Sequence, residues 1–537
     1  MARFALLLML GWMPVHVLAF ASRPRRMKAV LRRLGLSRGP TLGSSEFGSR
    51  DVTDEHNHEP VEILGEVPNY VRGTFYRQSG GAFVDGTDLT DGLAHVSAWH
   101  IGATSSFSNR FVQTRHLDKF RKSNGGVRNW VGVGGTAGDK ANYYENLNVN
   151  FERTADGIAA ASPENPFVQL ALLDASLGTK AVLQMVPSGR DISSASGLTF
   201  LASHHFEAPN REDLHGGVFL RMLPSAHFWI PPKFEAGYAV YRATTDHGLP
   251  LERVYEHILT TFDYMARASV PLEERVPYMH SMLETSGHVI FIISSKRMRY
   301  DSALAQFPNG FFAGFPYEHT APLQFEVLAK RADGSLERVG TCVAPTHGHV
   351  FHTVNAYDAA DGTIVADMTY SDGDLFDGTS DGDANPGRQD SLCRFTLDLA
   401  AGTASQELLS SEVKEFASCN QQVLQKPHRY VWGLDFSHKA AEDVVKVDTR
   451  TGQSMRWSLT SGWVPSEPQF VPRPGGVSED DGVLLLAANE IAAEKSWLLV
   501  LDAKSLTELA RLPAPIEVNT GLHNMFVPDA PSYPIKN

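Results

Sequence analysis

The chain has 537 residues, of which 42% are hydrophobic and 20% are charged, a composition typical of a globular protein with a large core. The net charge is −13, and because residues 1–45 hold eight Lys and Arg but no Asp or Glu, the remainder carries 40 basic against 61 acidic residues, a net charge of −21. An acidic body repels phosphate backbones, which argues against nucleic-acid binding, and three scattered cysteines argue against a disulfide framework or a cysteine-ligated metal site.

The N-terminus combines two kinds of targeting signal. Residues 4–13 are an apolar run that suits a signal peptide and is too short to span a bilayer. The following segment is rich in arginine and free of acids, which is typical of a transit peptide. We therefore expect a signal-like segment at 1–20, a transit-like segment at 21–45 and a linker at 46–58. This arrangement resembles the two-part targeting sequences of algae with secondary plastids and predicts a plastid location, with the secretory pathway as the alternative.

From about residue 59 onward one local pattern recurs: a short apolar strand, a polar turn with Asp or Gly, and a second strand, as in an antiparallel hairpin. The segments with this pattern are 170–182, 325–339, 395–409, 444–457 and 498–512, and further strands are expected at 288–295, 363–370 and 482–489. No βαβ alternation is present, and no later stretch has 18 uninterrupted apolar residues. We expect one all-β domain over residues 59–537, a β-propeller or a large sandwich.

Four histidines at the ends of strand-like runs are candidate metal ligands: His204, His280, His352 and His523. His352 lies in the stretch 346–358, which reads THGHVFHTVNAYD and holds three histidines. A neutral imidazole on a strand edge is a suitable metal ligand. The gaps of 76, 72 and 171 residues are far too long for a zinc finger or a helix-borne site. Only a radial fold, in which the innermost strands face one axis, would bring these side chains together; otherwise they are surface or core histidines.

Several segments resemble the carotenoid cleavage oxygenase family, which also contains the retinoid isomerase of the eye. The resemblance runs from about Pro60 to Pro528 and is strongest at VFHTVNAYD and GLHNMF. It also includes EILGEVPNYVRGTFYRQSGGAF at 62–83 and SEPQFVPRPGGVSEDDGVLL at 466–485. The resemblance implies a seven-bladed β-propeller with a loop and helix cap over a ferrous iron on its axis.

In this family four histidines bind the iron and three glutamates support them. The resemblance places the ligands on His204, His280, His352 and His523, and the glutamates on Glu145, Glu415 and Glu467. A carboxylate on the second ring nitrogen of a ligand histidine fixes its tautomer and its direction.

The chain departs from the family pattern at three places. Ser203-His204-His205 replaces the usual His-Pro pair, so His205 is an alternative first ligand. Ser281 stands where an aspartate is usual, and Gln78-Ser79 where Asn-Gly is common. The last two changes leave the ligands intact and bear on substrate specificity.

The implied activity is that of an Fe²⁺-dependent dioxygenase. Such an enzyme adds both atoms of O2 across one conjugated double bond of a carotenoid or apocarotenoid and releases two carbonyl products. It needs no catalytic acid, base or nucleophile beyond the metal centre. A retinoid or carotenoid isomerohydrolase on the same iron site is the alternative, and a non-catalytic propeller scaffold is another.

A carotenoid is too apolar to cross water at a useful rate, so we expect peripheral membrane contact by one face of the protein. The aromatic stretches 227–234 and 307–315 have the composition of a docking surface, since proline and glycine oppose regular strands there. Phe311, Phe312 and Phe315 are the candidate docking residues. The alternative is that these rings line the tunnel or pack on the propeller.

Overall fold

The structure of the protein is a computed structural model. It describes residues 51–82, 92–122, 147–154, 157–161, 169–184, 197–201, 214–223, 233–243, 251–263, 270–300, 314–373, 390–435, 443–458 and 462–529. In these ranges no helix has the length and hydropathy needed to cross a bilayer.

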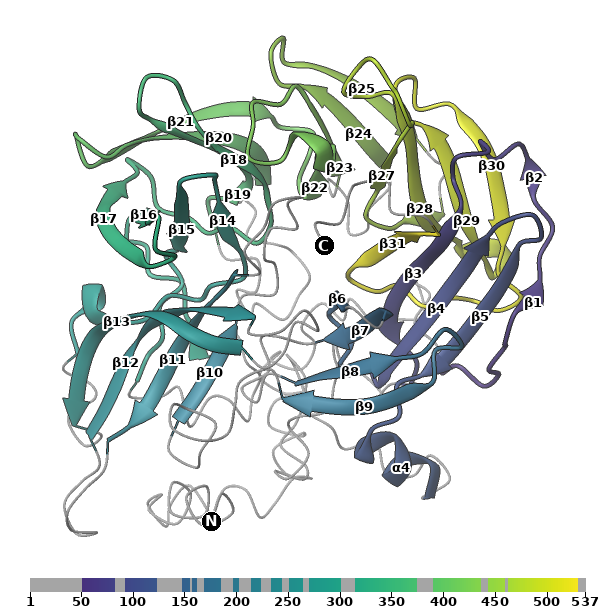
Figure 1. Ribbon diagram of the computed structural model, residues 1–537, viewed down its shortest axis with the longest axis horizontal. Coiled ribbons are helices and arrows are strands. Elements are labelled where there is room, and N and C mark those ends of the chain that lie inside the picture. The colour runs from purple at the N-terminus through teal and green to yellow at the C-terminus, as the bar shows by residue number, and fades with distance from the viewer. Residues whose placement is uncertain are drawn as a thin grey trace, which may run out of the picture.

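The described strands form six sheets arranged in a ring around a central axis, as Figure 1 shows. The first contains β1 (Glu59–Pro60), β5 (Ser106–Phe111), β4 (Ala94–Ile101), β3 (Gly73–Gly80) and β31 (Asn524–Pro528), in that spatial order. The next two contain β6 (Asn150–Thr154), β7 (Gly157–Ala161), β8 (Gln169–Leu173) and β9 (Thr179–Gln184), and then β10 (Gly197–Leu201), β11 (Leu214–Met222), β12 (Lys233–Ala243) and β13 (Leu251–Asp263).

An eight-stranded sheet follows, with β14 (Met282–Glu284), β15 (His288–Ile293), β16 (Gln324–Lys330), β17 (Leu336–Val343), β21 (Thr403–Ser410), β20 (Asp390–Asp398), β19 (Ile364–Ser371) and β18 (Thr353–Asp358). Its two antiparallel halves are joined by a single parallel pair, Val343 with Thr403. The fifth sheet contains β22 (Glu415–Ser418), β23 (Tyr430–Asp435), β24 (Asp443–Asp448) and β25 (Gln453–Ser458). The sixth contains β2 (Leu64–Gly65), β30 (Glu508–Pro513), β29 (Lys495–Asp502), β28 (Gly482–Glu490) and β26 (Trp463–Pro465), and β27 (Gln469–Pro472) also pairs with β28.

Helical segments are short in the described part of the chain. They are α4 (Arg115–Lys122) and the 3-10 turns η5 (Leu272–Glu274), η8 (Gln421–Val423) and η9 (Ile491–Ala493).

The hydrophobic pattern of the strands follows their place in the ring. A strand inside a sheet, such as β28 with the sequence GVLLLAANE, is buried along almost its whole length, because neighbouring sheets cover both of its faces. An outer strand such as β25, QSMRWS, is mostly exposed and correspondingly polar. The apolar cores lie between adjacent sheets: Phe75 and Trp99 of the first sheet pack in one cluster with Leu485 and Val500 of the sixth.

The hairpins expected from the sequence are confirmed, as are the three additional strands. Their turns share one device, in which an aspartate carboxylate accepts the main-chain N–H two residues ahead and fixes the turn. The aspartates that do so are Asp174, Asp333, Asp361, Asp398, Asp448 and Asp502.

The two ends of the described chain close the ring. The last strand, β31, pairs antiparallel with β3 near the start, and β2 pairs with β30. The β-propeller is therefore confirmed as the fold. The count of seven blades, the cap and the division of the chain at residues 20, 45 and 58 stay predictions.

The prediction that the aromatic stretches form a docking surface is wrong for two of their residues. Phe234 is buried and stacks on Phe262, and Phe315 is fully buried against Tyr278. Both belong to the apolar core under β12 and β15, so composition did not separate core from surface. Residues 227–232 and 307–313, with Phe311 and Phe312, lie outside the described residues.

Candidate metal centre

Three of the four predicted histidines each precede a strand that ends a sheet: two lie at the opposite ends of the eight-stranded sheet and one lies at the end of the first sheet. His280 comes just before β14, His352 just before β18 and His523 just before β31, and each of these strands is the terminal strand of its sheet or half-sheet. β14 lies against β18, and β31 lies against β6 and β27. Residues 72 and 171 positions apart in the sequence therefore meet before these strands.

The three imidazoles converge on one point. Each offers a ring nitrogen, and these nitrogens all lie within 4.8 Å of one another. The Nε2 atoms of His280 and His352 are 3.3 Å apart, close to the spacing of about 3 Å expected for two imidazole nitrogens bound side by side to one ion. The rings are nearly perpendicular, at 78° between His280 and His352 and 76° between His352 and His523.

Glu415, the first residue of β22, supports His352 from behind. Its Oε2 accepts a hydrogen bond from Nδ1 of His352, and the hydroxyl of Thr369 lies 3.2 Å from its Oε1. Burial raises the pKa of Glu415, but the contact with His352 and the hydrogen bond from the N–H of Phe416 outweigh burial, so the pKa of this carboxyl lies below its ordinary value. An ionised Glu415 keeps the proton of His352 on Nδ1 and leaves Nε2 available to a metal.

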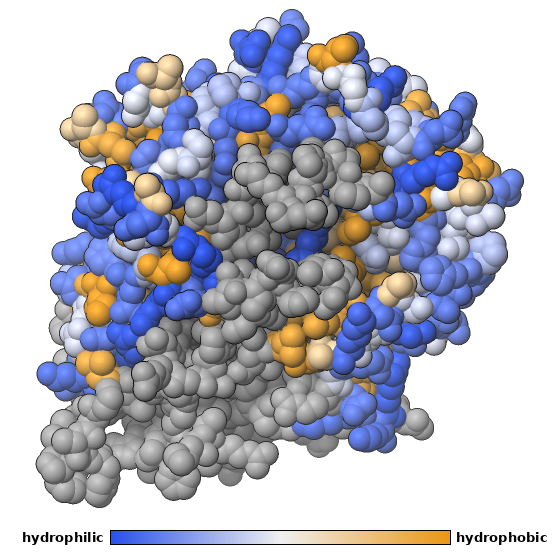
Figure 2. Space-filling view, viewed as in Figure 1, coloured by the Kyte–Doolittle hydropathy of each residue, from blue (hydrophilic) through white to orange (hydrophobic). Residues whose placement is uncertain are grey.

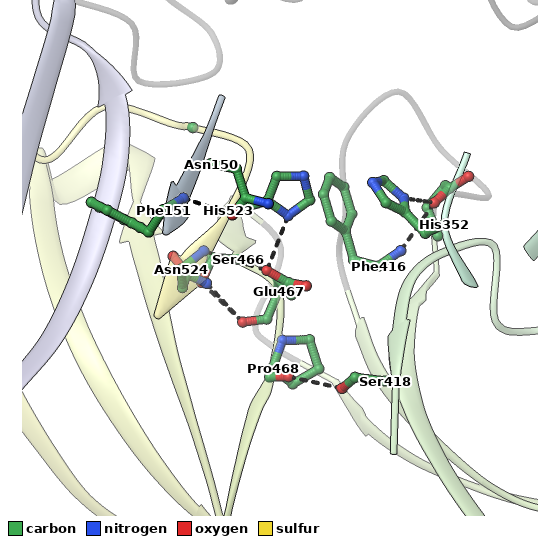
Figure 3. A network of polar contacts seen from close by, with 12 residues as sticks. Asn150, Phe151, His352, Phe416, Ser418, Ser466, Glu467, Pro468, His523 and Asn524 are labelled. Atoms are coloured by element: carbon green, nitrogen blue, oxygen red, sulfur yellow. Dashed lines mark hydrogen bonds and ion pairs between the residues drawn. The ribbon is translucent and has the colours of Figure 1, made fainter. Parts of the chain in front are cut away.

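Glu467, between β26 and β27, supports His523 in the same way. Its Oε2 lies 3.2 Å from Nδ1 of His523, and its main-chain carbonyl accepts a hydrogen bond of 2.8 Å from the side chain of Asn524 (Figure 3). Burial lowers the pKa of His523, and this outweighs the opposite effect of Glu467, so the imidazole is neutral near pH 7. A neutral imidazole is the form that binds a metal.

The loop before His523 can lie close to β3 because it contains a glycine, Gly521. A side chain at Gly521 would meet the carbonyl oxygen of Gln78 at 1.8 Å, so only glycine lets this loop lie against β3. There the N–H of Gln78 donates to the carbonyl of His523, and Arg77 donates to the carbonyl of Gly521 and the side chain of Asn524.

His280 is held by hydroxyl groups. The Tyr278 hydroxyl oxygen lies 2.8 Å from Nδ1 of His280, and the ring of Phe351 packs edge-on against the imidazole at 5.0 Å. Ser281, which stands at the family's usual aspartate position, donates from its hydroxyl to the carbonyl of Phe351. This bond ties the segment before β14 to the segment before β18 and so brings His280 next to His352.

Asp358 joins the same two strands at their far end. It accepts hydrogen bonds from Thr285, Ser286 and the N–H of Gly287, each 2.9 Å long, and contacts Nδ1 of His288 at 2.7 Å. Burial raises the pKa of Asp358, but these hydrogen bonds outweigh it and lower the pKa to about 2. The β14–β15 turn is therefore fixed to the end of β18.

A cavity of about 190 Å³ begins at the histidines. Its lining follows the strands nearest the axis from His352 to Val354, from Ala417 to Cys419 and from His523 to Phe526. Arg153 and Gln469 are among its polar lining residues. The cavity therefore extends from His352 and His523 along these strands.

The remaining predicted residues, His204 with its alternative His205, and Glu145, lie outside the described residues. Three residues that contact the histidines were not predicted from the sequence, namely Tyr278, Phe351 and Phe416. Tyr278 carries a signal that could have found it, because residues i and i+2 of an extended segment share a face and His280 is two positions on.

These groups form the donor set of a non-haem metal site on the axis of a β-propeller. Imidazole nitrogens suit iron, zinc, copper or nickel.

Comparison with known proteins identifies the family. Residues 49–528 match the family model described as retinal pigment epithelial membrane protein, and the chain belongs to this family. It is 33% identical over 192 residues to apocarotenoid-15,15'-oxygenase of Synechocystis sp., which covers 34% of this chain and 38% of the relative. It is 43% identical over 107 residues to the β,β-carotene 15,15'-dioxygenase of Rattus norvegicus, covering 20% of this chain and 19% of the relative. The aligned parts thus span well under two thirds of these relatives.

Solved structures agree on the fold. Cobalt-substituted Synechocystis ACO superposes with a TM-score of 0.69 at 21% identity and covers 90% of this chain and 98% of its own. The lignostilbene dioxygenase of Pseudomonas brassicacearum gives a TM-score of 0.68 at 21% identity, with 91% and 99% covered.

Proposed function

We propose that this protein is a metal-dependent dioxygenase that cleaves one conjugated double bond of a carotenoid or apocarotenoid into two carbonyl products. One observation carries the proposal: three imidazoles, each just before a different strand, offer ring nitrogens within 4.8 Å of one another in a chain that belongs to this family. The names of the similar relatives, an apocarotenoid oxygenase and a β-carotene dioxygenase, support the substrate class.

His280, His352 and His523 would hold ferrous iron through their Nε2 atoms, with His204 or His205 as a fourth ligand. Ferrous iron with an open position supplies the activation of dioxygen beside an electron-rich polyene. The reaction is balanced without a further reagent, because one C=C bond and one O2 molecule give two C=O groups. No side chain has to donate or remove a proton.

The work of the protein is to position the imidazoles and to offset charge. Glu415 and Glu467 fix the tautomers of His352 and His523, and their negative charges compensate a dication held by neutral ligands. Glu145 would be the third such carboxylate.

We propose peripheral membrane contact because the substrate has low solubility in water. Figure 2 shows a largely hydrophilic face on which the hydrophobic side chains of the described residues lie in separate groups. On the composition of the sequence, the proposal assigns the contact to 227–232 and 307–313. We also propose delivery to the plastid by the two-part leader, since carotenoids are made there.

The proposal is tested by incubating the purified protein with Fe²⁺, ascorbate and ¹⁸O2 and a panel of β-carotene, xanthophylls and apocarotenoids in detergent micelles. We expect aldehyde or ketone products that carry ¹⁸O, and no product from His352→Ala. Absence of cleavage across the panel would contradict the proposal. Isomerisation or hydrolysis of a retinyl or carotenoid ester by the same preparation would favour an isomerohydrolase.

A further inference from the structure

Phe416 follows Glu415 in β22 and has an unusual backbone. Its φ is 54°, a left-handed conformation that a residue with a Cβ atom rarely adopts. The other described non-glycine residues with positive φ lie in turns or loops, whereas Phe416 lies within a strand. The pairing with β23 is irregular here: Glu415 faces Leu434 and Ser418 faces Trp432, so one extra residue bulges from β22.

The bulge places the Phe416 ring between two of the converging histidines, as Figure 3 shows. The ring stacks on the imidazole of His352 with centroids 5.0 Å apart and planes at 28°. It also lies 5.5 Å from the imidazole of His523, at 59°. The same ring therefore limits how far either imidazole can rotate toward the other.

The main chain of Phe416 acts on the supporting carboxylate. Its N–H donates a 3.1 Å hydrogen bond to Oε2 of Glu415, the same oxygen that accepts from His352. Two residues further on, the hydroxyl of Ser418 donates to the carbonyl of Pro468, next to Glu467. The bulge thus connects the supports of His352 and His523.

We propose that Phe416 is a positioning residue for the metal centre, whose left-handed backbone aims the Glu415 carboxylate and whose ring holds the imidazoles of His352 and His523 at their mutual angle. A residue in a strand would relax from an unfavourable backbone conformation unless contacts with the surrounding structure stabilised that conformation. Here relaxation would withdraw the amide from Glu415 and the ring from between the two histidines. The inference rests on the proposed metal function, because it assigns Phe416 a role in binding the ion.

The test distinguishes the effect of the Phe416 ring from the effect of its backbone conformation. It uses the full-length protein and Co²⁺ as the bound metal. Phe416→Ala and Phe416→Gly both remove the ring, whereas Phe416→Tyr keeps it, and only glycine accepts a positive φ freely. We expect the dissociation constant for Co²⁺ to rise at least ~10-fold in the Ala and Gly variants, as for lost supporting contacts, and the visible cobalt bands to shift. Phe416→Tyr should keep the wild-type constant and spectrum.

The stability of the metal-free variants tests the role of the Phe416 backbone. Phe416→Gly should unfold at a higher denaturant concentration than Phe416→Ala while both bind cobalt weakly. Glu494→Gly is the matched control, because Glu494 has a φ of 52° in the turn before β29, and it should leave cobalt binding unchanged.

The outcomes distinguish the two proposals. If wild-type protein binds no Co²⁺, the metal function fails. If wild type binds Co²⁺ and the Ala and Gly variants match it in affinity and spectrum, or Phe416→Tyr loses as much as Phe416→Ala, the role of the ring is refuted. A Gly variant no more stable than the Ala variant would refute the role of the backbone.

Discussion

Replacing Glu415 by glutamine should weaken metal binding while leaving the fold intact. The carboxylate accepts from Nδ1 of His352 and the N–H of Phe416 through Oε2, and Thr369 lies 3.2 Å from Oε1. A glutamine has the same shape, and its carbonyl can accept both N–H groups. Its amide can donate to the Thr369 oxygen, because the Thr369 hydroxyl can instead donate to the carbonyl of His352, 3.1 Å away.

The change then removes one negative charge and little else. Loss of such a supporting group typically costs about 10–100-fold in metal affinity, which corresponds to about 1.4–2.7 kcal/mol. Anaerobic calorimetric titration with Fe²⁺ or Co²⁺ should measure this loss, and the denaturation midpoint of the metal-free protein should stay near that of wild type.

Glu415→Ala provides the contrast. It leaves two N–H groups without their acceptor, so we expect it to destabilise the metal-free fold as well, by about 1–3 kcal/mol for each buried group left unsatisfied. Wild-type metal affinity in Glu415→Gln would refute the reasoning, since the carboxylate would then not act on the site. A large loss of stability in that variant would show that the hydrogen bonds, not the charge, dominate.

Three further predictions concern other parts of the chain. Because the pKa of Asp358 is lowered to about 2, its stabilisation is present above the ordinary value of 3.8 and is lost as the pH falls through about 2. Asp358→Asn should therefore lower the free energy of unfolding by about 1 kcal/mol near pH 7, the shift being discounted for a partly exposed group, and the difference from wild type should shrink between pH 4 and 2 in urea titrations. Gly521→Ala should shift the loop before His523 and reduce metal occupancy, measured by elemental analysis; full occupancy would contradict the close approach to Gln78. Phe311→Ser with Phe312→Ser should release the protein from liposomes without loss of cleavage in detergent, whereas unchanged flotation would place the docking surface elsewhere.

Local features of the fold were predictable from the sequence because they depend on neighbouring residues. Apolar runs around an aspartate or glycine turn gave the hairpins at 170–182 and 498–512, since the aspartate fixes the turn by itself. Closure of the ring was not predictable this way, because the pairing of β31 with β3 joins residues about 450 positions apart and leaves no periodic signal.

The residues of the site also fall into those that the sequence could predict and those that it could not. The positions of His280, His352 and His523 came from family resemblance, since spacing alone did not separate ligands from ordinary histidines. Phe315 shows the limit of composition, because an aromatic residue among glycines fits a surface loop as well as the core that it occupies. No pattern in the sequence predicts the left-handed conformation of Phe416, because that conformation depends on contacts with segments distant in the sequence.

Metal content tests the central claim most directly. Wild-type protein, loaded anaerobically with Fe²⁺ and desalted, should retain one iron per chain by elemental analysis, and His352→Ala and His523→Ala should retain almost none while keeping the circular dichroism of a folded β protein. Stoichiometric zinc in protein purified without added metal, or iron retained unchanged in both variants, would contradict the assignment of these histidines to an iron centre.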